Sequence, residues 1–141
     1  MNHRGPVIII EDDEDDQFFF KEAFEKLNYP NEVIFFSDGL EALNFLTTND
    51  VSPFLIISDI NMPKLNGLEL HRKLKMDAAL NLRCIPYLFF STAVEQQAVI
   101  EAYSLSVQGF FLKQNKMDGL EKTIASIMDY WLRCASPNSF V

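Results

Sequence analysis

Several polar side chains stand at the points where short apolar runs of the sequence end. They are Glu11 and Asp12 after residues 7–10, Asp59 after residues 54–58, Ser91 and Thr92 where residues 87–91 end, and Lys113 after residues 109–112. If these runs are neighbouring parallel strands, their carboxyl ends meet at one edge of a sheet. We therefore expect these groups to share one shallow pocket.

The expected pocket would combine three carboxylates with a hydroxyl and an ammonium group. The carboxylates would repel one another unless a cation lay among them. Oxygen ligands partly open to water suit Mg²⁺, which keeps several waters and prefers one or two carboxylates together with phosphate oxygens. A lysine and a hydroxyl beside the ion would suit a phosphoryl group, whose oxygens need neutralisation from several directions. The pattern predicts a Mg²⁺ site that handles phosphoryl groups.

The elements that must position these groups alternate between strand and helix. The predicted strands are residues 7–10, 33–36, 54–58, 87–91 and 109–112. Apolar residues at helical spacing predict five helices. They cover about residues 14–27, a segment that opens with residues 37–46, a segment that includes residues 68–74, about residues 95–103, and a last segment that includes residues 120–132. Such alternation implies an α/β doubly wound fold, with a five-stranded parallel sheet and helices on both faces.

The acidic run from Glu11 to Asp16 divides into two parts. Glu11 and Asp12 belong to the predicted metal site. The four residues from Asp13 to Asp16 are better explained by the following helix, because an acidic first turn complements the helix dipole and Asp13 is a suitable N-cap. An EF-hand loop is excluded, because there is no glycine at the sharp turn and no closing glutamate.

Composition limits the classes of function. The chain has 141 residues, the length of one domain, and its formal net charge of −8 argues against a nucleic-acid surface. No apolar run is long enough to span a membrane, and no signal peptide is visible, so we expect a cytoplasmic protein. Cys84 and Cys134 form no motif, and His3 and His71, without metal-ligand spacing, are expected to face solvent.

Five segments together resemble the receiver domains of two-component response regulators, the chemotaxis type among them. The segments are "IIIEDD", "SDGLEAL", "LIISDINMPKLNGLEL", "IPYLFFSTA" and "AYSLSVQGFFLKQ". Each piece is weak alone, but their order and spacing are highly specific, and the resemblance runs from about residue 7 to residue 132. It implies a flavodoxin-like strand order of 2-1-3-4-5.

The resemblance also implies roles for the acidic residues. Asp59 would be the phosphoacceptor, which attacks the phosphoryl group of a kinase phosphohistidine to form an acyl phosphate. Asp12 would be a direct Mg²⁺ ligand, and Glu11 would help to hold the ion through water. The backbone carbonyl of Asn61 would be a further ligand.

The remaining implied roles concern the response to phosphorylation. Ser91, five residues after Pro86, matches the switch hydroxyl and would bond a phosphoryl oxygen, a role for which Thr92 competes less well. Lys113 would pair with Asp59 and then with the phosphate. Phe110 falls at the aromatic switch position, where the ring becomes buried on phosphorylation.

The sequence departs from the family pattern at four positions. Gln114 replaces the usual proline after the lysine, where the family has a cis peptide that costs about 3 kcal/mol without proline. Ser106 stands in place of glycine, and Phe110 lacks the hydroxyl of the commoner tyrosine. Ala93 carries no polar group to guide or block a water, which leaves the lifetime of the acyl phosphate open.

We expect a receiver domain over residues 7–134 with tails at 1–6 and 135–141, and therefore a stand-alone receiver. Its expected partners are a sensor histidine kinase or a histidine phosphotransfer protein and an unidentified downstream protein, with neither nucleic acid nor membrane. The expected output face comprises the helix near 95–103, the strand 109–112 and the last helix, and this face could also form a homodimer.

The sequence also bears on three other classes of function. Gln114 keeps open a phosphorylation-independent interaction module with the same fold. A phosphohydrolase with Asp59 as nucleophile would need a second acid two residues later, where Asn61 stands. A Rossmann dinucleotide enzyme would need a G-x-G-x-x-G motif after the first strand, and the sequence has none.

Overall fold

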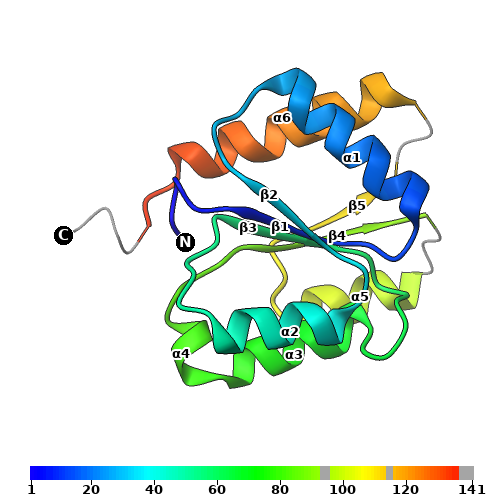
Figure 1. The fold of residues 1–141 in the computed structure, drawn as a ribbon. Coiled ribbons are helices and arrows are strands. Elements are labelled where there is room, and N and C mark those ends of the chain that lie inside the picture. The colour runs from blue at the N-terminus through cyan, green and yellow to red at the C-terminus, as the bar shows by residue number, and fades with distance from the viewer. Residues whose placement is uncertain (93–95, 114–115, 137–141) are drawn as a thin grey trace.

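A computed structural model describes residues 1–92, 96–113 and 116–136 of the chain. Five strands form one parallel sheet in the order β2-β1-β3-β4-β5 (Figure 1), which confirms the predicted fold class and strand order. Their bounds are Val7–Ile10 for β1, Val33–Phe36 for β2, Leu55–Ser58 for β3, Tyr87–Ser91 for β4 and Gly109–Leu112 for β5. The predicted third strand, residues 54–58, begins one residue earlier than β3 does.

Helices cover both faces of the sheet. Helices α1 and α6 lie side by side on one face, while α2, α3, α4 and α5 cover the other (Figure 1). Their bounds are Glu14–Leu27 for α1, Gly39–Thr48 for α2, Gly67–Met76 for α3, Ala78–Asn81 for α4, Gln96–Ser104 for α5 and Met117–Arg133 for α6. The single turn of α4 was not predicted. Among the described residues, no helix has both the length and the apolar character needed to cross a membrane.

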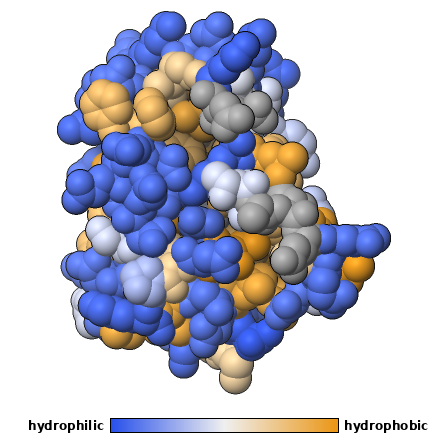
Figure 2. Space-filling model, turned by 90° about the vertical axis from the view of Figure 1, so that its right-hand side faces the viewer, coloured by the Kyte–Doolittle hydropathy of each residue, from blue (hydrophilic) through white to orange (hydrophobic). Residues whose placement is uncertain are grey.

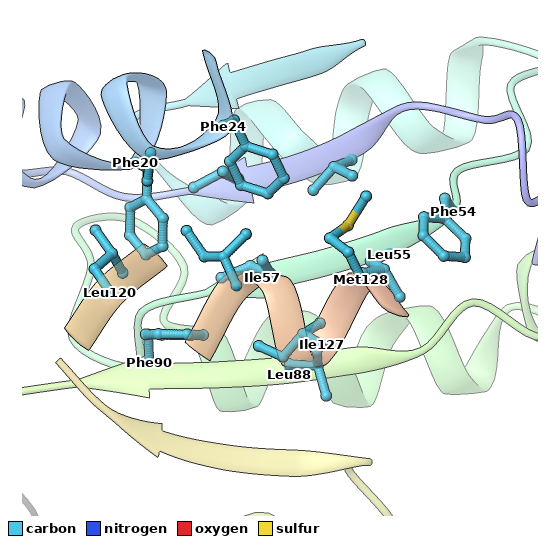
Figure 3. Close-up of a cluster of buried hydrophobic side chains, with 14 of the residues drawn as sticks. Phe20, Phe24, Phe54, Leu55, Ile57, Leu88, Phe90, Leu120, Ile127 and Met128 are labelled. Carbon is cyan, nitrogen blue, oxygen red and sulfur yellow. The ribbon is translucent and has the colours of Figure 1, made fainter. Parts of the chain in front are cut away.

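The central strands are buried on both faces, as their continuous apolar runs predicted. In β1, Ile9 packs into the core beneath α1 and α6, while Ile8 and Ile10 pack into the opposite core. Figure 3 shows the first core, where Phe20 of α1 meets Phe90 of β4 edge to face, with ring centroids 5.4 Å apart. Close packing of the two cores fixes the sheet between its helices. The carboxyl ends of the strands therefore have fixed positions relative to one another.

His71 is buried, so the prediction of a solvent-facing histidine was wrong for this residue. Its side chain lies on α3 with only 7% of its surface exposed, and its ring packs edge-on against Tyr87 at a centroid separation of 4.8 Å. The buried face of α3 also includes Gly67 and Leu70. His71 occupies the same helical stripe, because residues three and four apart share one face of a helix.

Candidate functional site

The sheet brings the predicted acidic residues together at its carboxyl edge. Ile10 of β1 is in register with Ser58 of β3, and the Asp59 N–H donates to the Ile10 carbonyl at 3.0 Å. One carboxylate oxygen from each of Glu11, Asp12 and Asp59 lies within 4.8 Å of the others. This edge faces the viewer in Figure 2, where several apolar areas interrupt a largely polar surface.

Glu11 is the most deeply buried carboxylate of this edge, with 1% of its surface exposed. Its Oε2 accepts a hydrogen bond from the Asp13 N–H at 3.1 Å, and its Oε1 forms an ion pair with Lys113. Burial raises the pKa of Glu11 to about 7, and the charge of Asp59 adds to this effect, while Lys113 opposes it. Three carboxyl groups share this edge with the ammonium group of Lys113, and a bound cation would relieve the repulsion among them.

Asp59 is held from both of its carboxylate oxygens. Oδ1 accepts a hydrogen bond from the Ile60 N–H at 2.7 Å, and Oδ2 lies 3.2 Å from Lys113 Nζ. Gly67 packs directly behind it, because a Cβ at position 67 would lie 2.2 Å from the Asp59 carbonyl oxygen. The Gly67 N–H also donates to the Ile60 carbonyl at 2.8 Å, which folds the loop after β3 back over the strand end.

Lys113 extends from the end of β5 into the acidic cluster. Its Nζ contacts Glu11, Asp16 at 2.8 Å and Asp59 at 3.2 Å, and only 11% of its side chain is exposed. Burial acts to lower the pKa of Lys113, but hydrogen bonds to Asp16 and Glu11 outweigh it and raise the pKa above its ordinary value. The ammonium group is therefore fixed in its charged form beside Asp59.

Asp16 corrects the sequence-based interpretation of the acidic run. Asp13 is the N-cap of α1 as predicted, and its Oδ1 accepts from the N–H groups of Asp15 at 2.8 Å and Asp16 at 3.0 Å. Asp16, however, does more than complement the helix dipole, because its carboxylate bonds Lys113 inside the site. Asp12 and Asn61 are exposed, and Asn61 lies in the loop two residues after Asp59.

The predicted switch residues lie beside this cluster on β4 and β5. Ser91 is buried, whereas Thr92 is exposed, and the Ser91 carbonyl accepts from the Lys113 N–H at 2.9 Å. Phe110 is half-buried next to Phe89, with their ring centroids 6.0 Å apart. Ala93 and Gln114 lie outside the described residues, so the question of a cis peptide after Lys113 does too.

Ser106 adopts the backbone conformation that explains the glycine of the family pattern. Its φ is 63°, in the left-handed region that glycine enters without a steric cost. The segment that carries Ser106 connects α5 to β5 and leads into Phe110.

Comparisons with known proteins match this chain to one family. The family model "Response regulator receiver domain" matches residues 7–125. FilR2 of Methanothrix harundinacea, described as a probable methanogenesis regulatory protein, is 26% identical over 89% of this chain and 83% of its own length. The response regulator Rcp1 of Synechocystis is 29% identical over 89% of this chain and 88% of its own length.

Two solved structures share the fold closely. The phosphorylated cyanobacterial phytochrome response regulator RcpA superposes with a TM-score of 0.85 at 28% identity, covering 95% of this chain and 99% of that chain. The Mn²⁺-bound form of Rcp1 gives a TM-score of 0.80 at 27% identity, covering 94% and 99%. The family model spans most of the chain, and both solved structures are described as response regulators. The chain belongs to the response regulator receiver domain family of two-component signalling.

Proposed function

We propose that this receiver accepts a phosphoryl group on Asp59 and signals through the resulting change in its surface. The donor would be the phosphohistidine of a histidine kinase or of a histidine phosphotransfer protein. The output would be altered protein binding or onward phosphotransfer. The observation that carries the proposal is the contact of Asp59 with Lys113 at 3.2 Å, at an edge where Glu11 and Asp12 supply further carboxylates.

The same residues suit a Mg²⁺ ion. Glu11, Asp12 and Asp59 offer hard oxygen donors within 4.8 Å of one another, which is the donor chemistry that Mg²⁺ prefers. Asp12 and Asp59 would bind the ion directly, Glu11 through water, and Asn61 through its carbonyl. The Mn²⁺-bound form of the relative Rcp1 supports a divalent cation here. When bound, the ion would neutralise charge on the carboxylates and on the phosphoryl oxygens.

The chain's own residues would carry the transfer. A carboxylate oxygen of Asp59 attacks phosphorus, the P–N bond to the donor imidazole breaks, and an acyl phosphate forms on Asp59. The charged ammonium of Lys113 lies 3.2 Å from Asp59 and would balance the negative charge that builds up on the phosphoryl oxygens. Asn61 is neutral, so no second acid stands two residues after the nucleophile, and phosphoacceptance is favoured over a phosphohydrolase reaction.

The response would act through Ser91 and Phe110. A phosphoryl oxygen would bond the Ser91 hydroxyl, and the half-buried ring of Phe110 would move further into its packing against Phe89. This is a population shift between two packings, and Phe110 contributes through packing alone because it has no hydroxyl. The face formed by α5, β5 and α6 borders both residues and would be read by the partner. It could also form a homodimer.

This face already exposes apolar side chains, which supports its role in binding. Ile100 and Tyr103 of α5 and Leu112 of β5 are each more than half exposed, at 52%, 53% and 53%. Exposed apolar residues that cluster on one face often mark a protein interface. A partner on this face would sense a movement of Phe110, which lies two residues before Leu112.

The test is intact-protein mass after incubation with Mg²⁺ and acetyl phosphate. We expect the wild type and Asp15→Asn, a change of an exposed carboxylate outside the cluster, to gain one phosphate. Asp59→Asn, and the wild type with the metal chelated, should gain none. Beryllofluoride binding, followed by NMR, covers a phosphate that hydrolyses too fast to detect. If the wild type neither gains phosphate nor binds beryllofluoride, the phosphorylation-independent interaction module replaces the proposal.

A further inference from the structure

Lys113 has a partner that the proposed phosphoryl chemistry does not use. Asp16 Oδ2 lies 2.8 Å from Lys113 Nζ, closer than the 3.2 Å between Lys113 and Asp59. Asp16 is not one of the three clustered carboxylates that could hold a metal, and it lies on α1 rather than at a strand end. The contact is partly shielded, since 30% of the Asp16 side chain and 11% of the Lys113 side chain are exposed.

The backbone around Asp16 is fixed on both sides. The N-cap Asp13 accepts hydrogen bonds from the N–H groups of Asp15 and Asp16, which sets the first turn of α1. Gln17 donates from its side-chain amide to the Glu11 carbonyl, which ties the same turn to the end of β1. The backbone of Asp16 is therefore held at a fixed position relative to Glu11, which places its carboxylate within reach of Lys113.

The other two partners of Lys113 have competing duties if the proposed function holds. Glu11 would turn toward the metal, and Asp59 would bind the metal and then carry the phosphoryl group. Lysine has a long flexible side chain, and its ammonium group is not held in direction by its own geometry. Asp16 has no such competing duty and can keep its bond to Lys113 throughout.

We propose that Asp16 is a positioning residue that holds the Lys113 ammonium over Asp59 during phosphoryl transfer. The inference rests on the proposed function of Asp59 and Lys113. It assigns to the first turn of α1 a part in the reaction that is separate from its N-cap. A charge-assisted hydrogen bond between partly buried groups is strong enough for this role, unlike a pair that is open to water.

Charge and position predict opposite effects for Asp16→Asn. The substitution removes a negative charge close to where an anionic phosphodonor must bind, so electrostatics alone would speed the reaction. Loss of the Lys113 anchor would slow it, because the ammonium would no longer be oriented toward Asp59. Asp15→Asn is the matched control, since it makes the same charge change one residue away on an exposed side chain.

The experiment measures phosphorylation by acetyl phosphate with saturating Mg²⁺ as a function of donor concentration. For Asp16→Asn we expect the rate at saturating donor to fall about fivefold with little change in the donor concentration at half-maximal rate. Asp15→Asn should match the wild type or exceed it, and Asp16→Glu should recover most of the lost rate. In a Lys113→Ala background, Asp16→Asn should cause no further loss.

A second readout does not depend on phosphorylation. With saturating Mg²⁺, when Glu11 and Asp59 would turn toward the ion, the ammonium ¹H–¹⁵N NMR signal of Lys113 should be visible in the wild type and in Asp15→Asn, because its pairing with Asp16 persists and slows proton exchange. It should be lost in Asp16→Asn.

The inference is overturned if Asp16→Asn reacts as fast as Asp15→Asn, or if its loss persists without Lys113. A persistent Lys113 signal in Asp16→Asn would also overturn it. If the wild type takes no phosphate but the NMR signal behaves as expected, then the proposed function fails while the anchoring of Lys113 by Asp16 stands.

Discussion

The buried imidazole of His71 should make the stability of this receiver sensitive to mild acid. Its Nδ1 is buried without a hydrogen-bond partner, and its ring packs against Tyr87. Burial lowers the pKa of His71 to about 4, and the positive charges of Lys75 and Arg72 contribute to the shift. A proton on this ring would be an uncompensated charge in the core beneath α3.

The magnitude follows from the difference between the folded and unfolded states. The unfolded chain binds the proton with the ordinary pKa of 6.5, while the folded chain binds it only near pH 4. The contribution to stability is therefore complete above pH 6.5 and is lost as the pH falls toward 4. Between pH 7.5 and pH 5, linkage gives a loss of about 2 kcal/mol from His71 alone.

The assay is urea denaturation of metal-free wild type and His71→Phe at these two pH values. Carboxylates titrate over the same range in both proteins, so the comparison isolates His71. Phenylalanine keeps the aromatic contact with Tyr87 and removes the ionisable group. We expect the wild type to lose about 2 kcal/mol more than the variant on acidification. Equal losses in the two proteins, or a His71 NMR titration midpoint near 6.5, would refute the reasoning.

Three further predictions concern the site and the loop that frames it. In Gly67→Ala, the new Cβ would lie 2.2 Å from the Asp59 carbonyl oxygen, so the loop that carries Asp59 must shift. We expect intact-protein mass to show no phosphate uptake, and the free energy of unfolding to fall by about 2–4 kcal/mol. Normal uptake would contradict this. Asn66→Ala should cost about 1 kcal/mol in urea denaturation, since Asn66 and Glu69 form the capping box of α3. Glu11→Gln should stabilise metal-free protein relative to wild type more at pH 8 than at pH 5. The raised pKa of about 7 means that wild-type stability is lost as pH rises from 4.5 through 7.

The strand ends could be predicted from sequence because two simple rules apply to them. Continuous apolar runs such as residues 7–10 and 87–91 indicate strands buried on both faces, and alternation with helices indicates parallel pairing. The carboxyl ends of parallel strands then lie at the same edge of the sheet, independently of how the side chains pack. This is why Glu11, Asp59 and Lys113 were brought together correctly although they lie far apart in the chain.

The burial of His71 follows from the helical periodicity of the residues around it. Gly67, Leu70, His71 and Leu74 recur at intervals of three, one and three residues, which places them on one face of a helix. That face packs against the sheet, so the histidine is carried into the core with its neighbours. The separate turn of α4 offered less signal, because four residues are too few to show a helical period.

The contact of Asp16 with Lys113 was not predicted, because the two residues are 97 positions apart in the sequence. It precedes Phe20 by four residues and Ala23 by seven, so it lies on the inward stripe of α1. Phe20 and Ala23 pack into the core beneath the helix, and the stripe then runs past the edge of the sheet. A polar residue at this point must face the strand ends, where Lys113 projects. The packing that buries Phe20 therefore also directs Asp16 at the ammonium group, and α1 links the core to the chemistry of the site.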